Sequence, residues 1–289
     1  MKALIFGING QDGYYLNKLL KQQQYEVTGV SRSGDFLRTD ITSYSEVSAL
    51  IKALQPQFIF HLAANSTTRH DVMFENHGTI STGTLNILEA VKTSSPQSKV
   101  FISGSGLQFK NENKPIKESD AFEARDAYSV SRIHSVYAAR YYRTLGIKAY
   151  VGYFFNHDSP LRSERHVTKK ITETVKRIAS GSSEPLEIGD TSVIKEWTFA
   201  GDVVNAIWTL IRQDNIFEAN LGSGKGYSIQ QWIEVCFTLA RKNWQEYVVH
   251  KAGFVPEYHK LVCNPSLIHA MGWAPRVSFE DLAAMMINT

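Results

Sequence analysis

The first half of the chain alternates short, continuously apolar runs with longer amphipathic stretches. The apolar runs are typical of buried β-strands and lie at residues 2–6, 25–30, 58–64, 99–104 and 148–155. Helix-length segments lie between them at residues 12–23, 45–54, 78–93 and 128–145. Fully apolar strands separated by helices indicate a parallel sheet that helices cover on both faces. The pattern therefore predicts an α/β fold built on a Rossmann-type, doubly wound parallel sheet.

The character of the chain changes after Asn156. A helical segment at residues 167–181 ends in a glycine, and the regular alternation of strand and helix does not continue beyond it. We therefore expect a large domain at residues 1–156 and a smaller mixed α/β lobe at residues 157–289. Some segments of the second region are expected to return to the first domain.

Composition narrows the classes of protein to consider. With 289 residues, 43% of them hydrophobic and 20% charged, the chain can bury a large core. A net charge of +3 is too mild to imply nucleic acid, and no such partner is expected. Cys236 and Cys263 lack the spacing of a metal site, so no metal is expected. No signal peptide and no apolar run near ~20 residues is present, so we expect a cytoplasmic protein without membrane insertion.

A glycine-rich turn follows the first predicted strand. In "FGINGQDGYYL", Gly7, Gly10 and Gly13 stand between that strand and the first predicted helix. Gly7 would permit the tight turn, Gly10 the approach of a pyrophosphate, and Gly13 the close packing of helix on strand. Because strand, turn and helix occur in the required order, residues 1–156 are predicted to bind a dinucleotide cofactor. Further candidate cofactor contacts in this turn are Asn9, Gln11 and Asp12.

The end of the second predicted strand bears on the choice of cofactor. An acidic residue commonly meets a free ribose 2′-hydroxyl there, but this chain has Arg32 between Ser31 and Ser33. A cation flanked by hydroxyls suits a 2′-phosphate, which favours NADP over NAD. The alternative is that Arg32 is an ordinary surface arginine. Asp40 could accept from the adenine amino group with Ile41 beside the ring, or Asp40 could merely cap the following helix.

These motifs resemble the extended short-chain dehydrogenase/reductase superfamily and, within it, GDP-mannose 4,6-dehydratases. "GINGQDGYYL" is similar to that family's opening, and "FFNHDSPLRSERHVTKKIT" is close to its most specific signature. "GTLNILEA", "LEIGDTSVIKEW" and "NPSLIHAMGWAPRVSFEDL" also resemble family segments, so the likeness spans the whole chain. "HLAANS" takes the place of a cofactor-contacting motif. By resemblance, this motif supplies Leu62, Ala63 and Ala64 to the cofactor and Ser66 to the substrate.

The resemblance also identifies a reactive centre, which is altered in this chain. Family chemistry uses a Tyr, a Lys four residues later, a Thr, and a Glu two residues after the Thr. Without any gap, Tyr128 keeps the tyrosine, the lysine becomes Arg132, and the Thr and Glu fall on Gly104 and Gly106. Tyr128 and Arg132 are the expected catalytic and cofactor-contacting pair. Ser105 is the nearest remaining hydroxyl and a catalytic candidate, although strand alternation should turn it away.

The substrate side resembles the family more closely. By resemblance, Asn156 meets the sugar or its diphosphate, and Val167 and Lys170 lie along the nucleotide. Lys195 stands where the family has a diphosphate-binding arginine. The alternative is that both lysines are ordinary surface residues. A second family arginine has no counterpart here, because Phe254 or Val255 takes its place.

Three functions remain open from the sequence. The leading one is an NADP-dependent enzyme that oxidises, reduces or epimerises a nucleotide sugar at C4, with a GDP-sugar as the first candidate and Tyr128 as acid/base. The second is a genuine GDP-mannose 4,6-dehydratase with relocated groups. It would require Glu112, Glu118 or Glu164 to reach C5 and C6 of the sugar, and the line-up places none of them there. The third is a catalytically weak protein that binds cofactor and nucleotide sugar. The family's long loop is shortened between Arg32 and Asp40, which favours a homodimer over the family's tetramer.

Overall fold

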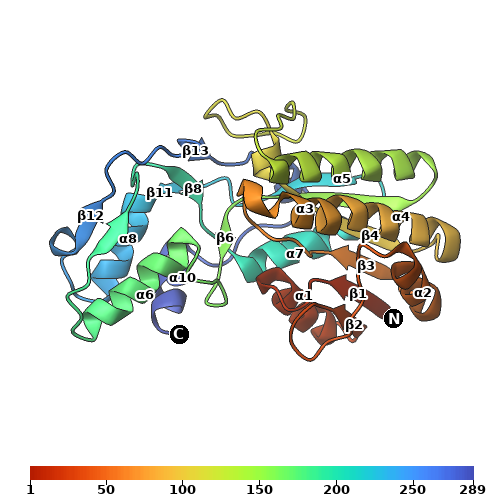
Figure 1. The fold of residues 1–289 in the computed structure, drawn as a ribbon, viewed down its shortest axis with the longest axis horizontal. Helices are drawn as coiled ribbons and strands as arrows, with labels where there is room; N and C mark the ends of the chain where they lie inside the picture. The colour runs from red at the N-terminus through yellow and green to blue at the C-terminus, as the bar shows by residue number, and fades with distance from the viewer.

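The computed structural model describes residues 1–289, and its centre is a six-stranded parallel sheet (Figure 1). The predicted α/β fold class is therefore confirmed. The strands are short and, apart from the edge strand at residues 26–30, almost wholly buried, as expected when both faces of a sheet are covered. In spatial order they are β10 (Glu218–Leu221), β5 (Lys148–Phe154), β4 (Lys99–Ser105), β3 (Phe58–His61), β1 (Lys2–Phe6) and β2 (Glu26–Val30).

Helices pack on both faces of this sheet and create two separate apolar cores. One face carries α1 (Gln11–Gln22), α7 (Ala200–Ile211) and α9 (Ser266–Ala270). The other carries α2 (Tyr44–Leu54), α4 (Gly83–Ser94) and α5 (Ala127–Thr144). A short helix α3 (Met73–Asn76) and a π-helical turn (His77–Thr82) lead into α4.

The third strand is shorter than its apolar sequence suggests. The predicted strand at 58–64 ends at His61, and Leu62 to Ala64 leave the sheet. Their backbone instead lies against the glycine turn, where a Cβ on Gly7 would come within 2.7 Å of the Ala63 nitrogen. Apolar residues at the end of this strand therefore line a cavity rather than extend the sheet.

The remaining residues form a smaller lobe, drawn to the left of the sheet in Figure 1. Its core contains Trp232, which is fully buried and stacks on Trp197 at 4.9 Å between ring centroids. The helices are α6 (Val167–Ala179), α8 (Ile229–Leu239) and α10 (Phe279–Ile287). The strands are β6 (His157–Asp158), β7 (Leu186–Ile188), β8 (Ile194–Glu196), β9 (Thr198–Phe199), β11 (Gly226–Ser228), β12 (Val248–His250) and β13 (Lys260–Leu261).

Part of the C-terminal half contributes directly to the large sheet. β10 pairs with β5 in parallel register, with Glu218 opposite Val151, and α7 and α9 pack beneath them. The division at residue 156 is not tested by this pairing and stays a prediction. No helix of the chain has the length and apolarity that crossing a membrane requires.

Candidate functional site

The glycine turn forms a cradle at the N-terminus of α1. Gly7 has φ +90°, and a Cβ on Gly13 would lie 2.4 Å from the carbonyl oxygen of Gly7. Neither position can carry a side chain without moving backbone. Gly10 caps α1, and a Cβ there would meet only the Gly7 oxygen at 3.3 Å. The backbone thus leaves open space at a positive helix end, which fits a pyrophosphate.

A cavity of about 430 Å³ opens beside this cradle. Its wall joins the turn after β1, the end of β2, the segment after β3 and the start of α3. Most of the predicted cofactor residues line it together, and Glu75 from α3, which the sequence did not point to, joins them. The predicted residues in its wall are Gly7, Asn9, Gly10, Arg32, Asp40, Ile41, Leu62, Ala63 and Ala64.

Two polar side chains in this cavity have defined partners. Arg32 Nη1 lies 2.8 Å from Glu75 Oε1. Asp40 Oδ1 accepts from the Thr42 nitrogen at 2.9 Å and from its hydroxyl at 2.7 Å, which lowers the pKa of Asp40. The cap of α2 is Ser43, so Asp40 stabilises the turn before that helix and is not its N-cap. One carboxylate oxygen of Asp40 is free of these contacts.

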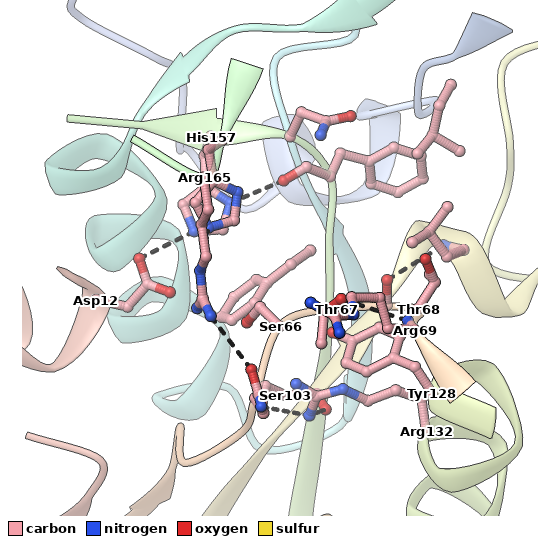
Figure 2. Close-up of a pocket in the computed structure, with 18 of the residues that line it drawn as sticks. Asp12, Ser66, Thr67, Thr68, Arg69, Ser103, Tyr128, Arg132, His157 and Arg165 are labelled. Atoms are coloured by element: carbon pink, nitrogen blue, oxygen red, sulfur yellow. Dashed lines mark hydrogen bonds and ion pairs between the residues drawn. The ribbon is translucent and has the colours of Figure 1, made fainter. Parts of the chain in front are cut away.

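A second cleft of about 600 Å³, which we call the reaction cleft, lies next to the first cavity. Leu62 borders both. Tyr128 and Arg132 reach the reaction cleft from the first turns of α5, a helix whose N-cap, Asp126, forms a capping box with Ser129. Asn156 also lines it, as does Ser66, which Figure 2 shows with Tyr128 and Arg132. The structure therefore gathers the predicted tyrosine, arginine and two substrate residues around one space adjoining the cofactor cradle.

Arg132 is turned towards the sheet and is only 3% exposed. Its Nη1 donates to the Ser103 carbonyl oxygen at 2.5 Å and to the Ser103 hydroxyl at 2.7 Å. Its guanidinium carbon lies 5.0 Å from the ring centroid of Tyr128, and its buried Nε has no partner. A guanidinium held without any carboxylate leaves uncompensated positive charge beside the phenol ring. Arg132 thus keeps the positive charge that the family's lysine carries, but its guanidinium is hydrogen-bonded to Ser103 of β4.

The end of β4 differs from expectation. Ser105 was expected to point away, and that expectation is wrong, because Ser105 and Ser103 both line the cleft. Residues two apart share a face of a strand, and it is Gly104 that faces the interior. A Cβ on Gly104 would lie 2.7 Å from the Tyr153 ring, and a Cβ on Gly106 2.8 Å from the Phe155 ring. Aromatic side chains of β5 and the residue after it occupy that space.

Asp12, which is partly buried, and His157, which is buried, form a pair across the cleft from Tyr128 (Figure 2). His157 Nε2 lies 2.9 Å from Asp12 Oδ1. Burial alone would raise the pKa of Asp12 and lower that of His157, but their mutual attraction outweighs burial in both. The pKa of Asp12 is therefore lowered and the pKa of His157 is raised. Next to them, Ser159 donates to Gln11 Oε1 at 2.7 Å, so Gln11 and Asp12 tie α1 to the segment around β6.

The other predicted substrate residues lie in adjoining cavities. Val167, Lys170 and Lys195 line a cavity of about 480 Å³, and Asn156, Val167 and Lys195 line one of about 230 Å³. Lys170 donates to the Glu187 carbonyl oxygen at 2.6 Å, and Lys195 lies 5.5 Å from the ring centroid of Tyr258. Neither lysine is a freely solvated side chain.

Arg165 is a residue that the sequence reasoning missed. It borders the reaction cleft and both adjoining cavities. Its only side-chain contacts are Asn65 Oδ1 and His166 Nε2, each at 3.4 Å, and no carboxylate neutralises it. Burial and the neighbouring arginines lower the pKa of His166 to about 3. The basic run "LRSERH" was a visible signal, but only the fold shows that Arg165 stands where three cavities meet.

None of the three proposed replacement carboxylates reaches the reaction cleft. Glu112 pairs with Lys110 on a surface loop, Glu118 accepts from the Asn220 nitrogen, and Glu164 pairs with Arg177. The sequence line-up likewise placed none of these three residues at C5 and C6 of the sugar. A different acid, Glu257, shares a cavity of about 280 Å³ with Gly106.

Comparisons with known proteins agree with this geometry. Residues 32–286 match the family model of GDP-mannose 4,6-dehydratase. GDP-mannose 4,6-dehydratase 2 of Arabidopsis thaliana is 31% identical, over 99% of this chain and 86% of that protein. Among solved structures, UDP-glucose 4-epimerase of Thermotoga maritima with UDP-glucose has TM-score 0.90 and 21% identity, with 100% and 98% of the chains covered.

A second solved structure shares the fold. RMD from Pseudomonas aeruginosa, complexed with NADPH, has TM-score 0.86 and 21% identity, and the match covers 99% of this chain and 97% of that one. Structures at this identity show the fold, whereas the family model and the Arabidopsis relative show descent. The chain belongs to the GDP-mannose 4,6-dehydratase family, whose members are short-chain dehydrogenase/reductase-type enzymes.

Proposed function

We propose that this protein is an NADP-dependent enzyme that oxidises, reduces or epimerises a nucleotide sugar, a GDP-sugar in the first instance, at C4. The observation that carries the proposal is Tyr128, which lines a cleft that shares Leu62 with the cavity beside the glycine cradle. NADP would supply or accept the hydride at C4. Its ribose and phosphates fit the cradle and the adjoining cavity, whose glycines leave space that side chains would fill.

Tyr128 is the proposed acid/base at the sugar's 4-oxygen. It would take the hydroxyl proton during oxidation and return it during reduction. The guanidinium carbon of Arg132 lies 5.0 Å from the centroid of its ring, and the hydrogen bonds of Arg132 go to Ser103 and not to the phenol. Ser105, in the cleft wall, is the proposed hydrogen-bond partner of the 4-oxygen. Gly106 carries no proton-moving group, so elimination of water by the family route lacks its carboxylate.

On the substrate side, Asn156 and Ser66 are proposed to contact the sugar. Lys195 and Lys170, with Val167, are proposed to line the nucleotide. We add Arg165, because an unneutralised guanidinium at the junction of three cavities is suited to a diphosphate. It would compensate in part for the family arginines that this chain lacks.

A specific observation supports a second candidate, dehydration with relocated groups. Thr68 lines the reaction cleft, and its hydroxyl donates to Glu257 Oε1 at 2.7 Å. Glu257 shares a cavity with Gly106 and has no cationic partner. A threonine and a glutamate are thus paired at the cavity that Gly106 lines. In this candidate, Glu257 would take the C5 proton and pass it to the departing C6 hydroxyl, so that water leaves and a C5–C6 double bond forms. The hydride taken from C4 would then return to C6 while C5 regains a proton.

Two assays on purified protein separate these functions. The leading proposal predicts NADPH oxidation with a 4-keto GDP-sugar, and loss of at least about 100-fold in Tyr128→Phe with NADP affinity unchanged. The second candidate predicts a 4-keto product from GDP-mannose that Glu257→Gln abolishes. Tight binding of GDP-sugar and NADP with neither ever consumed would refute both, and would identify a binding protein. Full activity in Tyr128→Phe would refute the assignment of the acid/base.

We further propose that the protein is a homodimer. Val130, Tyr137 and Tyr141 leave large apolar surface exposed along α5, with exposed fractions of 49%, 58% and 60%. A second copy covering that helix would bury them. Sedimentation velocity of wild type and Tyr137→Glu would test this, and a wild type that sediments as a monomer would refute it.

A further inference from the structure

The cavity proposed to hold the adenosine contains both a basic and an acidic side chain where the ribose 2′ group is expected to bind. Arg32 comes from the end of β2, as expected from the sequence, and Glu75 comes from α3. Ser33, next to Arg32, accepts from Asn9 Nδ2 at 2.8 Å, which ties this segment to the glycine turn. The acid that a free 2′-hydroxyl would need is therefore present, but it is supplied by a different element.

The two charged groups hold each other in place. Arg32 Nη1 lies 2.8 Å from Glu75 Oε1, and Asn65 Nδ2 donates to the other carboxylate oxygen at 3.4 Å. The Arg32 side chain is 76% exposed and that of Glu75 is 37% exposed. An exposed pair of this kind is weak, so a ligand can displace it at small cost.

We propose that Glu75 sets the choice between the two pyridine nucleotides, because it opposes a 2′-phosphate and accepts a hydrogen bond from a free 2′-hydroxyl. This inference rests on the proposed function, since it concerns the same cofactor site. Arg32 then favours NADP, and Glu75 limits that preference and admits NAD.

Two opposing effects follow from this geometry. A bound 2′-phosphate gains a charge-assisted contact with Arg32 but must compete with Glu75 for it and stand beside a like charge. A bound 2′-hydroxyl loses the contact with Arg32 but can donate to the Glu75 carboxylate, as acidic residues do in this fold. Substituting Arg32 should therefore lower the preference for NADP over NAD, and substituting Glu75 should raise it.

The test is direct titration of NADP and NAD by calorimetry, without any substrate. In Glu75→Gln, the affinity ratio of NADP to NAD should rise by about two- to fivefold, the size of a surface ion pair. In Arg32→Ala, the ratio should fall by about 10- to 100-fold, as expected for a lost charge-assisted contact. Glu184→Gln is the matched control, because Glu184 forms an exposed pair with Arg177 at 3.0 Å in the other lobe.

The outcomes separate failure of the inference from failure of the proposed function. A ratio that is unchanged in Glu75→Gln, or that falls in both variants, overturns the role of Glu75 while leaving cofactor binding intact. A shift in Glu184→Gln equal to that in Glu75→Gln overturns it as well. A wild-type protein that binds neither nucleotide refutes the proposed function, and this inference with it.

Discussion

The substitution Gly106→Glu puts back the type of side chain that the family carries at this position, and the structure predicts that it will fail. A Cβ at position 106 would lie 2.8 Å from Phe155 Cε1 and 3.0 Å from two further atoms of that ring. Phe155 is only 3% exposed and belongs to the core of the large domain. The ring would have to retreat by roughly 0.7 Å to reach ordinary carbon contact distance.

Overpacking of this kind costs about 1–3 kcal/mol. For a domain of this size, the melting temperature should fall by about 2–4 °C for each kcal/mol. Gly106→Glu is therefore expected to melt several degrees below wild type and to form no 4-keto product from GDP-mannose. Differential scanning calorimetry and detection of the product at alkaline pH measure the two effects.

A double-mutant cycle with Phe155→Leu isolates the contact. A smaller side chain at position 155 should relieve the clash, so the glutamate should destabilise the double variant less than the single one. An interaction free energy of about 1–2 kcal/mol is expected for residues in direct contact. A single Gly106→Glu variant that is as stable as wild type, or that dehydrates GDP-mannose faster than wild type does, would refute this reasoning.

Two further predictions concern buried charges. The pair of Asp12 and His157 should stabilise the fold most between the ordinary pKa values of 3.8 and 6.5. That stabilisation is lost as pH falls through the lowered pKa of Asp12 or rises through the raised pKa of His157. The difference in melting temperature between wild type and Asp12→Asn should accordingly shrink at alkaline pH, and a constant difference from pH 5 to 9 would contradict the pairing. For Glu218, burial opposes ionisation, but hydrogen bonds led by that from Arg140 lower its pKa to about 2. Its contribution, about 3 kcal/mol by linkage, should be present above the ordinary value and be lost as pH falls towards 2. Glu218→Gln should thus unfold more readily in urea at pH 7 and approach wild type at pH 2.5; equal stability at pH 7 would refute it.

Local sequence was sufficient for the parallel sheet and for the cofactor cradle. Five strands were predicted with boundaries within a few residues, because an apolar run in a fully buried strand needs no information from its neighbours. Gly7 and Gly13 were identifiable because backbone approach within one strand–turn–helix unit excludes a side chain. Tyr128 and Arg132 are one helical turn apart, so their proximity also followed from the sequence.

Contacts between distant segments were beyond the reach of such patterns. The end of β3 was predicted three residues too far, because apolar side chains at 62–64 line a cavity rather than a sheet. Ser105 was expected to face away from the cleft, but alternation along a strand specifies only which residues share a face. The packing of Tyr153 on Gly104 shows which face is the interior, and Ser105 lines the cleft on the other.

The sequence alone determined which chemical groups this protein retains: the phenol of Tyr128, a cation four residues later, and no carboxylate at position 106. The tertiary structure decided what those groups face. In the fold, Arg32 pairs with Glu75 and the Thr68 hydroxyl donates to Glu257. The rings of Tyr153 and Phe155 occupy the space beside Gly104 and Gly106. The physical reason is that local residue patterns specify secondary structure, whereas these partners lie 43 and 189 residues apart and meet only when the layers pack.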